Sequence, residues 1–164
     1  MAEQWNSIFQ KRATELDGDE WTLELDDSIV PGQNQQDWNQ YIRNAFAEFS
    51  CSLCSRWWPS KQVKVVFHFS LDPALHRGTV KVKCFKQKCR ECFDAEMEEP
   101  CFSSENIDVM VEKLMEKIRI RCYGAEPPES NRNLFFDDEI KGPHESDHCE
   151  ACLRGFCQEN DQIF

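Results

Sequence analysis

The chain has 164 residues, with 30 acidic and 19 basic side chains and a formal net charge of −11. That length allows one domain with its own buried core, or one domain and a tail. No part of the sequence approaches the roughly 18 consecutive apolar residues that span a bilayer. The first residues also lack the apolar stretch and cleavage site of a secretory signal. We therefore expect a cytoplasmic protein in a reducing compartment.

The charge is unevenly distributed along the chain. Residues 1–50 carry a net charge of −7, and residues 93–164 carry a net charge of −11. Between them, residues 61–92 hold eight basic and two acidic side chains, a net charge of +6. An anionic partner is expected to bind at this basic segment.

Apolar spacing predicts the elements of the first fifty residues. From Trp5 to Leu16 the apolar residues recur at near-helical spacing, which predicts a short amphipathic helix. Alternation over residues 21–25 predicts a strand. In residues 36–49 the apolar positions step by three and one, which predicts a second amphipathic helix that leads into Cys51.

After the first cysteine pair, the sequence predicts a hairpin and then a helix. Residues 63–70 and 79–86 alternate on either side of a turn, which predicts two antiparallel strands with lysines on their outer face. Residues 104–123 carry an apolar stripe at helical spacing, and Gly124 is placed to end that helix. Residues 125–147 are predicted to form a long loop.

Ten cysteines without a secretory signal favour metal binding over disulfides. Three C-x2-C pairs stand out, and they are Cys51/Cys54, Cys89/Cys92 and Cys149/Cys152. Each pair can wrap a tight turn around one tetrahedral zinc ion. The first two pairs flank the predicted hairpin, as in a zinc ribbon, and the third lies in a local group with His144 and Cys157.

We predict two zinc ions per chain and eight ligands. One site holds Cys51, Cys54, Cys89 and Cys92, and the other holds His144, Cys149, Cys152 and Cys157. The spacing is about as compatible with an exchange of pairs between the sites. His148 ranks below His144 because it adjoins Cys149. The remaining Cys84, Cys101 and Cys122 are predicted to be packing residues, and His68 and His76 are predicted to lie at the surface.

These elements predict an α+β fold in which a small zinc-stabilised antiparallel β-sheet, a zinc-ribbon-like hairpin, packs with amphipathic helices. We expect an N-terminal helical region over residues 1–50, a zinc-binding domain over 51–157 and a tail over 158–164. The sequence has no H-E-x-x-H, no G-x-S-x-G and no phosphate-binding glycine loop. Full coordination by cysteine points to structural zinc, so we predict neither an enzyme nor a small-molecule substrate.

The basic segment supplies a candidate anion-binding surface, made of Lys64, Lys81, Lys83, Lys86, Lys88 and Arg90. Such side chains neutralise the phosphates of RNA or of an anionic membrane surface. Trp57, Trp58 and Phe85 are candidates to stack on bases or to contact an apolar receptor segment. The alternative interpretation is a solvated lysine face with the tryptophan pair packed beside zinc.

Motifs from one end of the chain to the other form a combined pattern. They are Trp5 with Ile8-Phe9-Gln10, residues 38–49 leading into Cys51-x2-Cys54, Ser55-Arg56-x-Trp58, Gln62-Val63, Gln87-x-Cys89-x2-Cys92, Tyr123-Gly124, Gly142-Pro143-His144-x4-Cys149-Glu150-Ala151-Cys152 and Gly155-x-Cys157. This pattern resembles the receptor-transporting protein family, the three-CxxC zinc-finger proteins. The resemblance covers nearly the whole chain.

The resemblance implies an accessory or chaperone protein that promotes the trafficking and cell-surface expression of G-protein-coupled receptors of the odorant, taste and opioid types. As the alternative, it implies an interferon-induced antiviral module that binds viral RNA. Family members usually carry a C-terminal membrane anchor that follows this domain and leaves it in the cytosol. The usual anchor is absent from the sequence up to Phe164.

Overall fold

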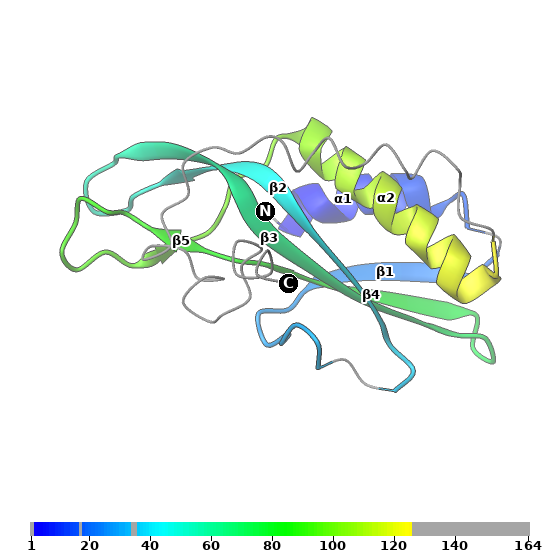
Figure 1. The fold of residues 1–164 in the computed structure, drawn as a ribbon. Helices are drawn as coiled ribbons and strands as arrows, with labels where there is room; N and C mark the ends of the chain where they lie inside the picture. Colours follow the sequence, from blue (N-terminus) through cyan, green and yellow to red (C-terminus); the bar gives the residue numbers. More distant parts are fainter. Residues whose placement is uncertain (1, 17, 34–35, 126–164) are drawn as a thin grey trace. The chain divides into compact units, whose positions relative to one another are not determined.

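The structure is a computed structural model that describes residues 2–16, 18–33 and 36–125. Within these residues it has the expected α+β composition (Figure 1). The elements are α1 (Ala2–Ala13), β1 (Glu20–Leu25), β2 (Asn39–Ser50), β3 (Trp57–Asp72), β4 (Arg77–Cys84), β5 (Gln87–Lys88), β6 (Met97–Glu98) and α2 (Ser104–Tyr123). One sheet has the strand order β1-β4-β3-β2, and β5 pairs with β6 in a second sheet. No helix of the described part combines the length and the apolar character needed to cross a membrane.

The chain divides into two compact units, and β2 and β3 contribute residues to both. Among the described residues, the helical unit contains 2–41, 66–83 and 104–125, and the cysteine unit contains 42–65 and 84–103. The expected division at residue 50 stays a prediction, because much of the proposed second domain lies outside the described residues.

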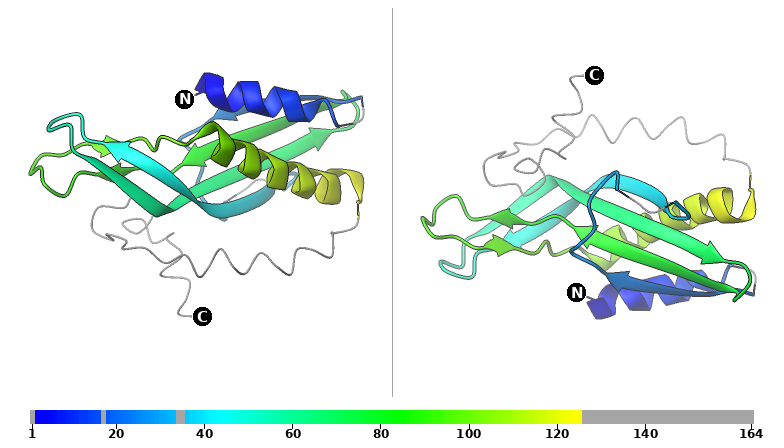
Figure 2. Two further views of the ribbon diagram at one scale, coloured as in Figure 1. Left: turned by 90° about the horizontal axis from the view of Figure 1, so that it is seen from above. Right: turned by 90° about the horizontal axis from the view of Figure 1, so that it is seen from below.

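In the helical unit, α1 and α2 lie on the same face of the strands (Figure 2). Trp5 and Phe9, one turn apart on α1, are fully buried. The predicted stripe of α2 is buried throughout, and it consists of Ile107, Met110, Val111, Leu114, Met115 and Ile118. The two helices are also joined by Arg12, whose Nε and Nη2 each donate to a carboxylate oxygen of Asp108 at 2.7 Å. Apolar burial therefore dominates the packing of this unit.

The end of α2 has the geometry that its sequence predicts. Gly124 has a φ of +69°, in the left-handed region that glycine adopts without strain. The N–H of Ala125 donates to the carbonyl oxygen of Arg119 at 2.9 Å, six residues back. This bond satisfies a carbonyl group of the last turn, which has no partner within the helix.

The strand β1 is confirmed, but its pairing was not predicted. β1 runs parallel to β4, with Trp21 opposite Gly78 and Leu25 opposite Val82. The Trp21 ring occupies the space where a Cβ atom on residue 78 would lie, so glycine is required there. The predicted hairpin is β3 and β4, which are sheet neighbours joined by residues 73–76, a connection short enough only for antiparallel strands.

The predicted helix over residues 36–49 is wrong, because the structure has the strand β2 there. Towards its end the burial alternates, with Ala47 and Phe49 buried and Phe46 exposed. The step of three and one places Phe46 on the same helical face as Phe49. Exposure of Phe46 shows that a period of two describes this segment, and pairing beside β3 decides its structure.

Candidate metal centre

The four cysteines of the first two C-x2-C pairs meet in the cysteine unit. The sulfur atoms of Cys51, Cys54, Cys89 and Cys92 all lie within 4.8 Å of one another. The Sγ atoms of Cys51 and Cys92 are 3.7 Å apart, as are those of Cys54 and Cys89. A tetrahedral zinc ion with Zn–S bonds of about 2.3 Å requires S–S distances of about 3.8 Å. The four thiols therefore fit one tetrahedral zinc site. Each of the two close pairs consists of one cysteine from the first motif and one from the second.

The first knuckle, residues 51–56, follows directly from the end of β2. The N–H of Cys51 donates to Arg56 O at 2.8 Å, and the N–H of Ser55 donates to Cys51 O at 3.0 Å, which closes the turn. Ser55 has a φ of 64°, a left-handed conformation that lets the chain reverse after the second ligand. The N–H of Leu53 donates to Cys51 Sγ at 3.4 Å. Such N–H···S bonds orient the sulfur and stabilise its thiolate form.

The second knuckle, residues 89–92, follows β5 and repeats this arrangement. Burial raises the pKa of the Cys89 thiol, but hydrogen bonds from the backbone of Glu91 and from Arg56 outweigh it and lower that pKa to about 7. The Arg56 Nη1 atom lies 3.9 Å from Cys89 Sγ. A side chain from β6 holds the first knuckle, because Glu98 accepts hydrogen bonds from both the N–H and the hydroxyl of Ser52 at 2.8 Å.

The neighbouring thiols affect Cys92 in the opposite direction. Its hydrogen bond with Cys54, together with burial, raises the pKa of Cys92 to about 12. Cys89 and Cys92 therefore differ in how readily they ionise, although both belong to one cluster. All four thiols must lose their protons to bind a divalent ion, so metal affinity falls as the pH falls.

A buried hydrogen-bond network of Trp58, Gln87 and Ser60 lies next to the first knuckle. Trp58 stacks on Phe49, with ring centroids 5.5 Å apart and planes at 11°. Trp58 Nε1 donates to Gln87 Oε1 at 3.0 Å, and Gln87 Nε2 donates to the Ser60 hydroxyl at 2.9 Å. The Arg56 guanidinium lies 5.1 Å from the centre of the Trp58 ring. Trp58 is thus packed beside the cysteine cluster, as the alternative interpretation of the tryptophan pair expected, whereas Trp57 is exposed.

Sequence reasoning did not assign a role to Gln87, Ser60 or Arg56 at this site. The sequence signal for Gln87 is its place two residues before Cys89, whereas its burial is seen only in the structure. A buried amide needs partners for both its oxygen and its nitrogen. Only the folded chain shows that Trp58 and Ser60 provide them.

Comparison with known proteins places this cluster in a described family. A family profile described as a zinc-binding domain, of the three-CxxC zinc-ribbon type, matches residues 44–155. Receptor-transporting protein 2 of Mus musculus is 31% identical over 154 residues, which cover 93% of this chain and 69% of that protein. The chain belongs to the receptor-transporting protein family. The expected resemblance is thus confirmed, and the domain that contains the cluster is a zinc-binding domain.

Other receptor-transporting proteins match most of this chain but extend well beyond it. Receptor-transporting protein 3 of Mus musculus is 35% identical over 97% of the chain, and receptor-transporting protein 4 of Mus musculus is 34% identical over 90%. The chain spans 34% of the former and 61% of the latter. No solved structure matches this chain.

Half of the predicted ligands of this receptor-transporting protein lie outside the described residues. They are His144, Cys149, Cys152 and Cys157, together with the competing His148. In the described part of the chain, the four-cysteine cluster is the one group with metal-binding geometry. Cys84 is buried and Cys122 is half-buried, while Cys101 is exposed, and none of them belongs to the cluster. The second zinc site stays a prediction.

The expected outer face of lysines is wrong at two of its six positions. Lys64 and Lys83 are buried, with exposed fractions of 5% and 2%. Lys83 Nζ donates to the carbonyl oxygen of Asp27 at 3.0 Å. β3 and β4 are the two inner strands of their sheet, and an alternating pattern does not reveal that both faces of such strands are covered.

The other four basic side chains remain candidates for anion binding, although Lys81 and Arg90 already have anionic neighbours. Lys81 Nζ lies 3.8 Å from a carboxylate oxygen of Glu24 and 3.8 Å from one of Asp26, and 5.2 Å from the centre of the Trp38 ring. Lys86, Lys88 and Arg90 are half-buried or exposed. Whether they bind RNA or a membrane surface stays a prediction.

The two predicted surface histidines differ. His76 is exposed, as expected. His68 is buried, which is a correction, and its Nε2 lies 2.9 Å from Gln40 Oε1. Burial lowers the pKa of His68 and favours the neutral ring. Its place on an inner strand again explains the error, since the polar face of that strand is not solvated.

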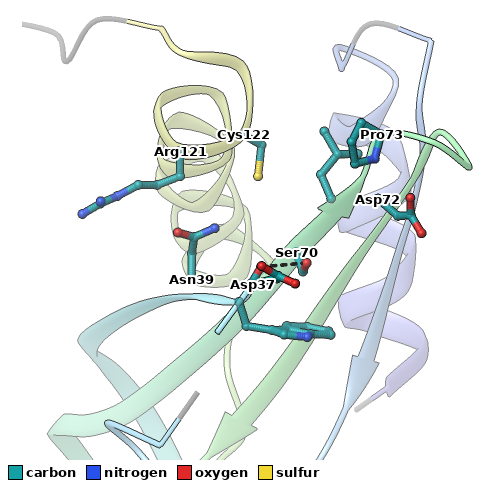
Figure 3. Close-up of a pocket in the computed structure, with 9 residues that line it drawn as sticks. Asp37, Asn39, Ser70, Asp72, Pro73, Arg121 and Cys122 are labelled. Carbon is teal, nitrogen blue, oxygen red and sulfur yellow. Dashed lines mark hydrogen bonds between the residues drawn. The ribbon is translucent and has the colours of Figure 1, made fainter. Parts of the chain in front are cut away.

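The helical unit contains an open polar cleft of about 690 Å³ near the end of α2 (Figure 3). Asp37 and Asp72 line it opposite Arg121 and the half-buried Cys122. Ser70 donates a hydrogen bond to the carbonyl oxygen of Asp37 at 2.9 Å. The cleft has acidic and basic groups but no described group of metal ligands, and it lies in the other unit from the cysteine cluster.

Proposed function

We propose that this chain is an accessory protein that binds G-protein-coupled receptors of the odorant, taste and opioid types on the cytosolic side of the membrane and promotes their delivery to the cell surface. Family membership carries the proposal, because the relatives that match nearly the whole chain are named for receptor transport. The four-cysteine cluster supports it by supplying the zinc-dependent fold that the family domain requires.

In this proposal zinc is structural and the protein is not an enzyme. Four thiolates occupy all four coordination positions of a tetrahedral zinc ion and leave none for water or substrate. The knuckle backbones and Arg56 hold Cys51 and Cys89 in position, and the network around Trp58 keeps the site packed. Bound zinc supplies cross-linking of two distant segments rather than reaction chemistry.

Receptor surface staining tests this proposal. The chain, both as printed and attached to a membrane anchor, is co-expressed with a panel of receptors, and a receptor-transporting relative serves as the positive control. We expect a several-fold rise in surface signal that the variant Cys54→Ser abolishes. Cys101→Ser is the matched control, because its exposed thiol lies outside the cluster. A surface signal that stays at its baseline for every receptor, while the relative raises it, overturns the proposal.

The proposed zinc content is two ions per chain. Native mass spectrometry of the purified protein measures it directly. We expect loss of one ion in Cys54→Ser and of the other in Cys152→Ser. A content of one in the unchanged protein, with no loss in Cys152→Ser, overturns the second site while leaving the first intact.

The antiviral RNA-binding alternative has narrower support after the burial of Lys64 and Lys83. Its remaining basis is the short series Lys86, Lys88 and Arg90, together with the exposed ring of Trp57 in the same unit. A gel-shift titration with RNA at low and high salt tests it, because phosphate contacts make binding salt-dependent. Binding that is unaffected by Lys86→Glu with Lys88→Glu contradicts this alternative.

A further inference from the structure

We propose that the outer surface of the two knuckles binds a segment of the transported receptor that combines apolar with basic side chains, as cytosolic segments next to membrane-spanning helices do. We call this surface, made of Leu53, Phe93, Asp94, Glu96 and Glu99, the knuckle surface. The proposal rests on the proposed function, because that function supplies a membrane protein as partner.

Exposed apolar side chains at both knuckles are the first observation. Leu53, between the ligands of the first knuckle, is 58% exposed, and Phe93, next to the last ligand of the second, is fully exposed. The two turns converge on one cluster of sulfur atoms within 4.8 Å. A single exposed apolar residue needs no explanation, but two at the tips of one rigid site form a potential contact surface.

The knuckle fold does not need these apolar side chains. Leu53 contributes its backbone N–H to Cys51 Sγ, and no packing role is available to a ring as exposed as that of Phe93. Burial of a phenylalanine ring against a partner removes its apolar surface from water and is favourable. An exposed ring beside a metal ligand therefore has binding energy available for a partner.

Negative charge surrounds Phe93 and is the second observation. Residues 91–99 contain five acidic and no basic side chains. Asp94, Glu96 and Glu99 are exposed. Glu98 is used in the hydrogen bonds to Ser52, and Glu91 lies 3.4 Å from the Nε atom of Arg90. A zinc ion with four thiolates adds a net charge of −2 beside this segment. The basic residues Lys86 and Lys88 precede Cys89 and do not belong to the acidic segment.

Charge complementarity selects among the possible occupants. Residues 126–164 of the same chain have ten acidic and three basic side chains, so they do not complement an acidic surface. A second copy, at a net charge of −11, and an anionic lipid surface are disfavoured for the same reason. The cytosolic flanks of membrane-spanning helices carry an excess of Lys and Arg next to apolar residues, which matches both features.

A peptide-binding measurement tests the proposal with the full chain. The probe is a fluorescent peptide with the Lys/Arg-rich juxtamembrane sequence of a receptor whose surface level the chain raises, and its counterpart has those residues changed to Glu. We expect salt-dependent binding of the first peptide only. Phe93→Ser weakens binding about tenfold, as loss of a central aromatic contact does. Asp94→Lys with Glu96→Lys weakens it at least as much, because the charge is reversed.

Leu75→Ser is the matched control, since Leu75 is 62% exposed but lies in the turn of the helical unit, far along the chain from both knuckles. Zinc content is measured for every variant, and unchanged content shows that the knuckles are intact. Knuckle variants that bind the peptide as the unchanged chain does overturn the inference. Knuckle-dependent binding to phosphatidylserine vesicles, or knuckle-dependent dimerisation without peptide binding, overturns it in favour of lipid or a second copy.

The same variants separate this inference from the proposed function in cells. If the unchanged chain raises receptor surface levels and Phe93→Ser raises them equally, the proposed function stands and the knuckle surface is not the binding site. If the unchanged chain raises no receptor, the proposed function fails, and the knuckle surface as a receptor-binding site fails with it.

Discussion

The two units of the molecule bury different kinds of side chain. Among the described residues, the helical unit buries eighteen apolar side chains, and the cysteine unit buries ten, of which two are the proposed ligands Cys51 and Cys89. Two ion pairs also connect α2 to the N-terminal segment of the helical unit. They are Arg12 of α1 with Asp108, and Arg119 with Glu15, which lies just beyond the end of α1. We therefore expect apolar burial to stabilise the helical unit without metal, and the cysteine unit to depend on metal cross-linking.

Loss of a ligand is expected to have the largest effect and to be confined to the cysteine unit. Structural zinc contributes an apparent free energy of about 10 kcal/mol or more to folding. Cys54→Ser therefore abolishes protection of amides in residues 42–65 and 84–103, measured by hydrogen exchange, and leaves α2 protected. Cys101→Ser is the control. Equal loss of protection in both units contradicts the difference between them.

A cavity in the helical unit gives the reverse pattern. Leu114 is fully buried on α2, and Leu114→Ala lowers the free energy of unfolding by about 2–5 kcal/mol through lost burial and the cavity left behind. Thermal unfolding measures this loss, and zinc content stays unchanged. Val109→Ala, at an exposed position of the same helix, is the matched control with a small effect. Loss of zinc in Leu114→Ala instead would show that the two units do not fold independently.

A change in the network of Trp58, Gln87 and Ser60 tests how much side chains other than the ligands contribute to the stability of the cysteine unit. Gln87→Leu removes the acceptor of the buried Trp58 Nε1 and the donor to Ser60. An unsatisfied buried donor costs about 1–3 kcal/mol, so we expect zinc to be lost at a lower chelator concentration. Gln87→Glu keeps an acceptor for Trp58 and serves as the comparison. No change in chelator sensitivity would assign the stability of this site to the four cysteines alone.

The smallest predicted effect is a pH dependence of the helical unit. Hydrogen bonds from Tyr123 and then His76 lower the pKa of Asp19. Burial and the hydrogen bond to Asp19 raise the pKa of Tyr123 to about 12. Because the pKa of Asp19 is lower in the folded state, its contribution is complete above the unfolded pKa of about 3.9 and is lost as the pH falls through the folded value.

The Tyr123 contribution has the opposite dependence, since its folded pKa is raised. It is complete below the unfolded pKa of about 10 and is lost as the pH rises towards 12. Thermal unfolding followed across the acid range in Asp19→Asn checks the first of these, because that variant loses part of the acid sensitivity. Asp94→Asn, in the other unit, is the control. An acid limb that is unchanged in Asp19→Asn contradicts the role assigned to this carboxylate.

The sequence predicted the elements whose pattern has a single structural explanation. The stripe of α2 fits only a helix with one buried face, and all six of its positions are buried. The first two C-x2-C pairs identified the cluster because tetrahedral coordination requires two knuckles. The prediction of a helix over residues 36–49 failed. The apolar spacing of these fourteen residues fitted a helix, but pairing with the neighbouring strand β3 makes the segment the strand β2.

The burial of polar side chains on the inner strands could not be predicted from the sequence. Lys64, Lys83 and His68 alternate with apolar residues as solvated side chains do, yet they lie on inner strands and are buried. The exposure of Leu53 and Phe93 was equally hidden, because apolar residues beside ligands suggest packing. Strand order within the sheet decides the first case, and it is a long-range property that local spacing does not contain.

The N–H···S bonds of the knuckles come from backbone groups, so they do not depend on the side chain of the donating residue. Leu53 serves Cys51 through its backbone alone, and the backbone of Glu91 does the same for Cys89. Any residue with a backbone N–H can occupy these two positions without loss of that bond. The side chains at positions 53 and 91 can therefore differ between proteins that keep the same zinc site, and the surface beside the metal can change without a change in its coordination.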